Sequence, residues 1–377
     1  MRALLFLLPG LGDALTSGPI IEGAARANWS LDVAAMLEPV RQYGAALDSV
    51  GEVEYFDLFK GPVAALPSVV RMRRHAYDAA FLPFPATRWQ YHALACAIGA
   101  KVLYTHDYGG AARLLDRAVG ARLVALQGGH RIAENARLAR AAGLTVPAPS
   151  YVVPPVWKSA RKPELLGVHP GTMRYKGNEQ RRWPLANFAA LVRSCVERGR
   201  RVRLFIGPEE REESTPLIAA IGSPLVEVVD ANLDEAARSL SECEVFVGND
   251  AGFGHLAAAL GVKTVVLYGM TDPVRSLPVG RTLAVRPSDC PSCHDEGMRT
   301  FDCVRNIDFR CIRIDLTVAD AARAVERAFS SEIGMATARE SGDFRLYGRA
   351  RTSRVTTSAS DPTNQKSADA SDIASGT

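Results

Sequence analysis

Polar and glycine residues gather in the stretch GNDAGFGHLAAALGV, residues 248–262, between two apolar runs. A helix that begins near Gly254 would present unpaired N–H groups and the positive end of its dipole. Because Gly252 and Gly254 lack Cβ atoms, an oxyanion can approach the backbone, and His255 can add a hydrogen-bond donor. Asp250 either caps the helix or accepts hydrogen bonds from hydroxyl groups. The stretch therefore suits a diphosphate, and an ordinary capped helix is the alternative interpretation.

A basic loop, HPGTMRYKGNEQRRWP at residues 169–184, is a second candidate for phosphate binding. Thr172 offers a hydroxyl group, and Lys176, Arg181 and Arg182 offer cations just before a predicted helix N-terminus. These basic groups could neutralise a pyrophosphate. A flexible basic loop without a ligand is the competing interpretation.

Asp13 ends the sequence PGLGD, at the carboxyl end of the first predicted strand. A carboxylate that projects from there into a cleft between two domains could accept a proton from a substrate hydroxyl group. An aspartate that merely caps a helix is the simpler alternative.

Four of the seven cysteines follow one another at the spacing Cys290-x2-Cys293-x9-Cys303-x7-Cys311. In a reducing compartment, such a cluster favours a metal over disulfides. Four thiolates could hold a structural Zn²⁺ or iron ion, with His294 as an alternate ligand. A loop of free cysteines packed on the neighbouring domain is the alternative.

The elements that must position these residues alternate between apolar strand patterns and helical patterns. This alternation is typical of an α/β protein whose parallel sheets are covered on both faces. Strands are expected at 3–8, 31–36, 52–58, 77–84, 101–106, 165–169, 201–207, 226–230, 244–248 and 263–269. Helices are expected at 14–28, 63–75, 89–98 and 184–198, one after the capping pair Asn232 and Glu235, and a last one from Thr317 to Phe329.

The alternation is interrupted at residues 145–164, which carry five prolines. We therefore predict two α/β domains, residues 1–150 and 165–335, joined by a linker at 151–164. The second domain would carry the cysteine-rich insert at 290–311. The tail at 341–377 is rich in Ser, Thr, Ala and Asp and cannot bury enough apolar area to order itself, so we expect it to be disordered.

Composition narrows the classes of partner and location. The net charge of +4 over 377 residues gives no reason to expect a nucleic-acid partner. A basic run at residues 71–75 is either a solvated helix face or a site for an anionic partner. No apolar run approaches the roughly 18 residues of a membrane-spanning helix. The run ALLFLL stops at Pro9 and is interpreted as a buried strand rather than a signal peptide, so we expect a cytoplasmic protein.

Four motifs occur in an order that resembles glycosyltransferase family 9, the ADP-heptose:lipopolysaccharide heptosyltransferases. They are GxGD at Gly10–Asp13, PG[ST] with a later basic residue and WP at Pro170–Thr172 and Arg181–Pro184, DxGxxHxAAAxG at Asp250–Gly261, and YGxTDP at Tyr268–Pro273. The resemblance covers about residues 1–330, and four motifs in order are fairly specific.

The resemblance implies a GT-B fold, in which two Rossmann-like domains with parallel sheets face a central cleft. The N-terminal domain would bind the acceptor and the C-terminal domain the nucleotide sugar. It further implies inverting transfer of heptose, or a related sugar, from ADP-heptose to a hydroxyl group of a lipopolysaccharide core acceptor. That acceptor is an anionic glycolipid at the inner membrane, which would make the enzyme a peripheral membrane protein, and no catalytic metal is expected.

At the matching positions, the resemblance assigns Asp13 as the general base. It assigns donor binding to Thr172, Lys176, Arg181, Glu209, Glu210, Asp250, Ala251, Gly252, Gly254 and His255. Within this set, Glu209 or Glu210 would hold the donor ribose. Ala251 stands where the family usually has Ser or Thr, so one hydroxyl contact is lost.

Two alternatives to lipopolysaccharide heptosyl transfer remain open. A protein O-heptosyltransferase, similar to the autotransporter heptosyltransferases, would use the same donor, and a metal held by the cysteines would favour it. A non-catalytic nucleotide-sugar-binding scaffold protein would need no base, and Asp13 argues against it.

Overall fold

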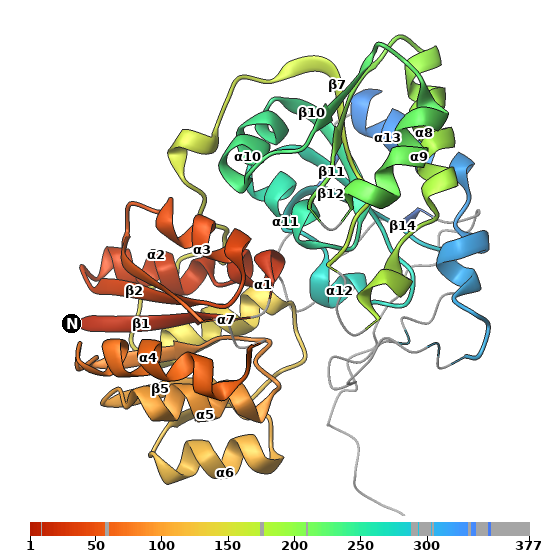
Figure 1. The fold of residues 1–377 in the computed structure, drawn as a ribbon. Coiled ribbons are helices and arrows are strands. Elements are labelled where there is room, and N and C mark those ends of the chain that lie inside the picture. Colours follow the sequence, from red (N-terminus) through yellow and green to blue (C-terminus); the bar gives the residue numbers. More distant parts are fainter. Residues whose placement is uncertain are drawn as a thin grey trace, which may run out of the picture.

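The structure, a computed structural model, describes residues 1–8, 10–56, 60–173, 177–208, 210–287, 293, 303, 305–330, 333–336 and 346–347. Within these residues, two mainly parallel sheets with helices on both faces form two consecutive domains (Figure 1). The predicted α/β class with parallel sheets is therefore confirmed. No helix of the described ranges is long and apolar enough to cross a membrane.

The first domain contains a parallel sheet with the strand order β3-β2-β1-β4-β5-β6. Its strands are β1 (Arg2–Leu7), β2 (Ser30–Ala35), β3 (Val50–Tyr55), β4 (Ala79–Leu82), β5 (Val102–His106) and β6 (Arg122–Val124). Its helices are α1 (Leu11–Thr16), α2 (Gly18–Arg26), α3 (Glu38–Ala45), α4 (Pro62–Arg73), α5 (Trp89–Ile98), α6 (Gly110–Ala118) and α7 (Arg131–Ala141). In β1, Leu5 and Phe6 enter the cores on opposite faces, which explains why this strand is apolar from Ala3 to Leu7.

The second domain repeats this strand order as β9-β8-β7-β10-β11-β12, extended by antiparallel β13 and with β14 beside β12. Its strands are β7 (Lys162–His169), β8 (Arg201–Phe205), β9 (Val226–Val229), β10 (Cys243–Asn249), β11 (Lys263–Leu267), β12 (Gly280–Val285), β13 (Met335–Ala336) and β14 (Leu346–Tyr347). Its helices are α8 (Leu185–Glu197), α9 (Arg211–Ile221), α10 (Leu233–Ser241), α11 (Gly252–Ala259), α12 (Pro273–Ser276) and α13 (Val318–Ser330). The short helical turns are η2 (Pro155–Trp157), η3 (Asn178–Arg181) and η4 (Cys311–Asp315).

Three large clusters of buried apolar side chains lie between the two sheets and the helices that cover them. One lies between the first sheet and helices α4 and α5, and another between the second sheet and helices α8, α9 and α13. The third continues from α1, α2, α3 and α7, through Trp157 of the linker, to α10 and α11. The domains therefore share apolar contacts in addition to the covalent linker.

Hydrogen bonds also join the two domains. The side chain of Gln42 accepts the N–H of Leu233 at 3.0 Å. Nε2 of His130 donates to the carbonyl of Leu277 at 2.8 Å. In the linker, Trp157 Nε1 donates to Asp234 Oδ1 at 2.6 Å. These contacts fix the orientation in which the two sheets present their strand ends.

Local backbone chemistry explains where the predicted boundaries were wrong. The predicted helix at 14–28 is two helices, because α1 ends at Thr16 and α2 restarts with Pro19 in its first turn. The predicted strand at 77–84 ends at Leu82, just before Pro83, which has no N–H for the sheet. The second sheet already begins at Lys162, inside the predicted linker. Of the predicted tail at 341–377, only Leu346–Tyr347 is described, and it pairs with β12.

Candidate functional site

The loops that follow β1, β7 and β10 carry the candidate functional residues. β1 neighbours β4 in the first sheet, and β7 neighbours β10 in the second, so the strand order reverses at each of these pairs. Ligands of doubly wound sheets bind beyond the carboxyl ends of strands at such switch points. Asp13 follows β1, Thr172 follows β7 and Asp250 follows β10. The topology therefore places all three residues where this fold binds ligands.

Asp250 joins two of the sequence motifs. The N-cap residue of α11 is Ala251 and the helix begins at Gly252, so Asp250 is not the helix cap and the helix starts earlier than predicted. Asp250 Oδ2 instead accepts hydrogen bonds from Arg181 Nη1 at 2.9 Å and from the Thr271 hydroxyl at 2.7 Å. The basic loop and the YGMTDP motif thus meet at one buried carboxylate.

The glycines of this loop allow close packing. A Cβ on Gly252 would lie 2.8 Å from the backbone N of Gly12 and 3.2 Å from Cβ of Leu11, both in the first domain. A Cβ on Gly254 would lie 3.4 Å from Cγ2 of Val266, in the sheet beneath. Their missing side chains therefore serve protein contacts, and phosphate binding by their N–H groups stays a prediction.

Asn249, the last residue of β10, links the phosphate-binding candidates. Its Oδ1 accepts the N–H of Trp183 at 2.9 Å, and its Nδ2 donates to the carbonyl of Pro170 at 2.6 Å. The side chain is buried, with 1% of its surface exposed. One amide therefore holds both ends of the basic loop against the loop that carries Asp250.

Thr172 and Glu210 belong to a neighbouring cluster around Arg182. Nε of Arg182 donates to the Thr172 hydroxyl oxygen at 3.0 Å, and Nη2 contacts Glu210 Oε1 at 3.4 Å. Both Thr172 and Glu210 are buried. The two adjacent arginines therefore serve different partners, since Arg181 reaches Asp250 while Arg182 holds Thr172 and Glu210.

Asp13 lies in the first turn of α1, where its carboxylate accepts hydrogen bonds. Its Oδ2 accepts the N–H of Gly10 at 3.3 Å, and its Oδ1 accepts from Arg131 Nη1 of α7 at 2.8 Å. Oδ2 thus caps α1 by accepting the N–H of its N-cap residue Gly10, as the helix-capping interpretation predicts, while Oδ1 pairs with Arg131. The side chain keeps 18% of its surface exposed, so the oriented carboxylate remains accessible to solvent.

His255 is a buried, neutral imidazole. Only 4% of its surface is exposed, and its Nδ1 lies 2.8 Å from the Tyr151 hydroxyl oxygen. Burial lowers the pKa of His255 to about 3, the cations Arg131 and Arg181 act in the same direction, and Asp250 opposes them. The ring therefore carries no charge near neutral pH and can act as a hydrogen-bond donor through one nitrogen.

The loops of the proposed base and of the phosphate site touch across the domain interface. A Cβ on Gly12 would lie 3.0 Å from Cδ2 of His255 and 3.1 Å from Cα of Gly252. Figure 1 shows α1 and α11 side by side at the junction of the two domains. The residue before Asp13 therefore contacts both the histidine and the start of α11.

Four candidate residues lie outside the described part of the chain. They are Lys176, Glu209, Cys290 and His294. Their predicted roles in donor binding and metal binding therefore stay predictions.

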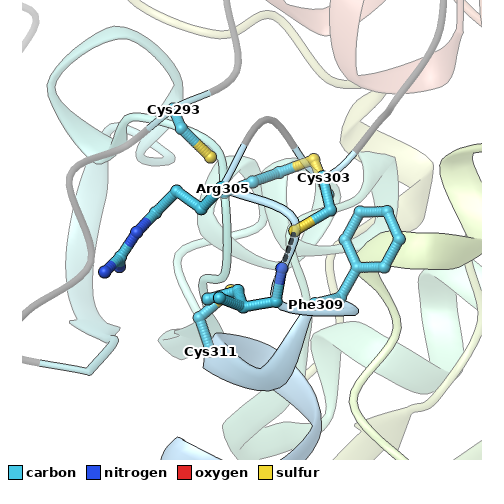
Figure 2. Close-up of a pocket in the computed structure, with 7 residues that line it drawn as sticks. Cys293, Cys303, Arg305, Phe309 and Cys311 are labelled. Atoms are coloured by element: carbon cyan, nitrogen blue, oxygen red, sulfur yellow. Dashed lines mark hydrogen bonds between the residues drawn. The ribbon is translucent and has the colours of Figure 1, made fainter.

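Three of the four clustered cysteines, Cys293, Cys303 and Cys311, line one pocket (Figure 2). The other residues that line it are Met270, Arg305, Ile307 and Phe309. Cys303 Sγ accepts the N–H of Ile307 at 3.3 Å. Burial opposes ionisation of this thiol, but hydrogen bonds from the N–H groups of Phe309, Ile307 and their neighbours lower the pKa of Cys303. Within the described residues, which do not include Cys290, no group of three His, Cys, Asp or Glu is arranged to hold a metal.

Two residues of the site were missed by the sequence reasoning. Arg131 lies 118 positions from its partner Asp13, and no local pattern connects them. Tyr151 lies in the proline-rich linker, where an aromatic ring with a polar tip gives only a weak signal. Thr271 was part of the quoted YGMTDP motif, but its bond to Asp250 has no sequence signature.

Comparison with known proteins agrees with these motifs. A family model described as glycosyltransferase family 9 (heptosyltransferase) matches residues 114–299. Lipopolysaccharide heptosyltransferase 2 of Escherichia coli is 28% identical over 132 residues, which are 34% of this chain and 37% of the relative. Lipopolysaccharide heptosyltransferase 1 of Pseudomonas aeruginosa is 37% identical over 110 residues, which are 29% of this chain and 31% of the relative. The chain thus matches about a third of the length of these curated relatives.

Solved structures share the complete two-domain arrangement. The structure of the E. coli ADP-heptose lipopolysaccharide heptosyltransferase II covers 87% of this chain and 98% of its own, with a TM-score of 0.67 and 19% identity. The E. coli heptosyltransferase WaaC with ADP gives a TM-score of 0.66 at 19% identity, over 87% and 100% of the two chains. The iron-containing dodecameric glycosyltransferase TibC of E. coli gives 0.55 at 14% identity, over 88% and 78%.

These structural likenesses establish the fold, which is of the GT-B type with two Rossmann-like domains. Together with the family-model match over residues 114–299 and the curated relatives, they confirm that the chain resembles glycosyltransferase family 9, as its four motifs predict.

Proposed function

We propose that the protein is an inverting glycosyltransferase that moves heptose, or a related sugar, from ADP-heptose to a hydroxyl group of a lipopolysaccharide core acceptor. The observation that carries the proposal is the contact between the two domains. Gly12, next to Asp13, touches His255 and the first residue of α11. A base on one domain and an anion site on the other are what a transfer between two bound substrates requires.

In the proposed reaction, Asp13 accepts the proton of the acceptor hydroxyl group while the acceptor oxygen attacks the anomeric carbon from the face opposite the diphosphate. The negative charge that gathers on the diphosphate is met by the N-terminus of α11, by His255 and by Arg181. Arg181 has several N–H donors, so it can hold Asp250 and a phosphate oxygen at the same time. These groups supply electrostatic stabilisation of the kind that a divalent cation gives elsewhere.

A donor screen tests this proposal. ADP-, UDP- and GDP-sugars are mixed separately with the purified protein, and thermal stabilisation is measured. We expect a shift with ADP-sugars, and a shift confined to UDP-sugars would exclude the heptose donor. Asp13→Asn should still be stabilised by the ADP-sugar but should not transfer the sugar. Turnover at the normal rate by that variant would remove Asp13 from the role of base.

We also propose a cytoplasmic protein that associates peripherally with the inner membrane through α4. Val63, Leu66 and Val70 share the outer face of this helix and expose 75%, 56% and 50% of their surface. The exposed Arg73 and Arg74 lie at the end of the same stripe. An apolar stripe that ends in cations suits an anionic lipid surface.

Vesicle sedimentation tests this membrane surface. The protein should sediment with vesicles that contain phosphatidylglycerol and less with phosphatidylcholine alone. Leu66→Ser combined with Val70→Ser should reduce sedimentation, whereas Leu114→Ser, at a more exposed position on α6, should not. Equal sedimentation of all variants would remove α4 from this role.

A structural metal at the cysteine cluster is the remaining part of the proposal. Cys293, Cys303 and Cys311 share one pocket, and the lowered pKa of Cys303 favours the thiolate that a metal needs. Zn²⁺ or iron held there would favour the second candidate function, heptosyl transfer to a protein side chain. Elemental analysis of protein purified without chelator should find about one metal ion per chain. Absence of metal would leave free cysteines as the correct interpretation.

A further inference from the structure

Tyr151, the first residue of the predicted linker, contacts both a backbone N–H and His255. Its hydroxyl oxygen accepts the N–H of Val279 at 3.0 Å and lies 2.8 Å from Nδ1 of His255. The two rings meet edge to face, with centroids 6.0 Å apart. Within the described residues, these are the two hydrogen-bond contacts of the hydroxyl group.

The direction of the second hydrogen bond follows from counting protons. A tyrosine hydroxyl has one proton to donate, and Val279 already uses one of its lone pairs. If Nδ1 of His255 also donated, the tyrosine proton would be left in a buried place without an acceptor, which costs about 1 to 3 kcal/mol. The hydroxyl group therefore donates to Nδ1, and Nδ1 carries no proton.

A neutral imidazole with an unprotonated Nδ1 carries its proton on Nε2. Nε2 of His255 has no hydrogen-bond partner within the described residues. Its neighbour in the ring, Cδ2, faces Gly12, so this edge of the ring lies toward the loop that carries Asp13. The free donor of His255 is thus on the edge that faces the interface between the two domains.

We propose that Tyr151 is a positioning residue that fixes His255 in the tautomer protonated at Nε2, so that His255 can donate a hydrogen bond to a nucleoside diphosphate. The role in diphosphate binding rests on the proposed function, while the tautomer itself does not. Tyr151 belongs to the predicted linker. One side chain of the linker would therefore decide which ring nitrogen of His255 donates a hydrogen bond at the proposed anion site.

Nitrogen NMR of the protein labelled at histidine tests the tautomer without any substrate. His255→Gln identifies the His255 signals by their loss. We expect Nδ1 of His255 to show the chemical shift of an unprotonated ring nitrogen in the unmodified protein. Tyr151→Phe keeps the ring but not the hydroxyl group, and it should move this signal toward a mixture of tautomers. A protonated Nδ1 in the unmodified protein would overturn the proposal.

A double-mutant cycle with ADP as the probe tests the consequence for binding. Tyr151→Phe should weaken ADP binding about three- to tenfold, the usual range for one hydrogen bond. In the His255→Gln background, the same substitution should change ADP binding less than about twofold, because the interaction it acts through is gone. An equal loss in both backgrounds would show that Tyr151 merely holds the linker, and would overturn the proposal.

Tyr43→Phe is the matched control. Tyr43 is also buried, and its hydroxyl group donates to the carbonyl of Val152, the residue after Tyr151, at 2.8 Å. It should lower stability while leaving the His255 signals and ADP binding unchanged. If the unmodified protein does not bind ADP, the proposed function fails, and the NMR result alone then decides the role of Tyr151.

Discussion

At the scale of single residues, the site depends on charged groups that other side chains orient. Asp13 is held by Arg131, and Asp250 by Arg181 and Thr271. The ion pair between Asp13 and Arg131 is only partly buried, with 18% and 20% of the side chains exposed. It therefore orients the carboxylate without sealing it from a substrate.

Replacement of Arg131 tests this orientation. Arg131→Met removes a hydrogen bond between charged groups, which contributes about 1.5 to 3 kcal/mol. If that bond aligns the base in the transition state, kcat should fall about 10- to 100-fold. Arg131→Lys should recover part of the loss, because it restores the charge without the planar geometry. Steady-state kinetics with the ADP-sugar would measure both variants, and an unchanged kcat in Arg131→Met would exclude the positioning role.

Residue types and spacing predict both Asp250 and Arg181, but of the pair Asp13 and Arg131 they predict only Asp13. Asp13 and Asp250 were found because each follows an apolar strand just before a predicted helix, and His255 because it lies in the first turn of such a helix. Arg131 and Tyr151 were not, because Arg131 reaches Asp13 only when α7 packs against α1, and Tyr151 reaches His255 only when the linker packs against the second domain. Long-range pairing of this kind leaves no periodic signal in the sequence.

At the scale of secondary-structure elements, α1 and α11 meet through glycines. The backbone N of Gly12 would lie 2.8 Å from a Cβ on Gly252, too close for any side chain. This contact lets the loop of the proposed base and the start of α11 approach at backbone distance. Larger residues would hold the two loops apart.

Gly252→Ala should therefore disturb the interface between the domains. The new Cβ must push the backbone of α1 away, so we expect a lower melting temperature and a larger radius of gyration by small-angle X-ray scattering. Gly254→Ala, in the same helix, is the control for these two measurements, since its Cβ would meet Val266 Cγ2 at 3.4 Å, an ordinary contact. Identical scattering from both variants and the parent would contradict a tight contact at Gly252.

Elements were predicted well where local chemistry decides them. The helix expected at 89–98 is α5, and Asn232 caps α10 as expected, with Oδ1 accepting the N–H of Glu235 at 3.0 Å. Thr317 and Asp320 likewise form a reciprocal cap before α13. The start of α11 was misplaced, because a glycine-rich helix start has no side-chain cap to mark it.

At the scale of the whole molecule, two domains whose sheets share one strand order are joined by a cluster of buried apolar side chains. The alternation of strands and helices predicts the class and the two domains. It does not predict the strand order, because neighbours such as β1 and β4 are separated by two other strands in sequence. Pairing between distant strands is decided by packing that no local pattern contains.

Buried histidines give the whole molecule a pH-dependent stability. Burial lowers the pKa of His106 to about 4, and it lowers the pKa values of His169 and His255 to about 3. Unfolded histidines titrate near 6.5. Between these values the unfolded chain binds more protons than the folded chain, so stability falls as pH drops below about 6.5.

We therefore expect the free energy of unfolding in urea to fall from about pH 7 to about pH 5, by up to about 2 kcal/mol for each of the three histidines. His169→Phe should make this slope shallower, because it keeps a ring against Phe253, whose centroid lies 4.7 Å away, but cannot bind a proton. A stability that stays constant over this range would contradict the burial of these imidazoles.

The amide of Asn249 has a consequence for building chimaeras from related chains. It bonds to the backbone at Pro170 and at Trp183, about 80 and 70 positions earlier in the chain. A crossover placed between residues 184 and 248 takes the amide from one parent and the loop that it holds from the other. The stretch from Pro170 to Asn249 is therefore best inherited whole, although it cuts across the middle of a domain rather than following its boundary.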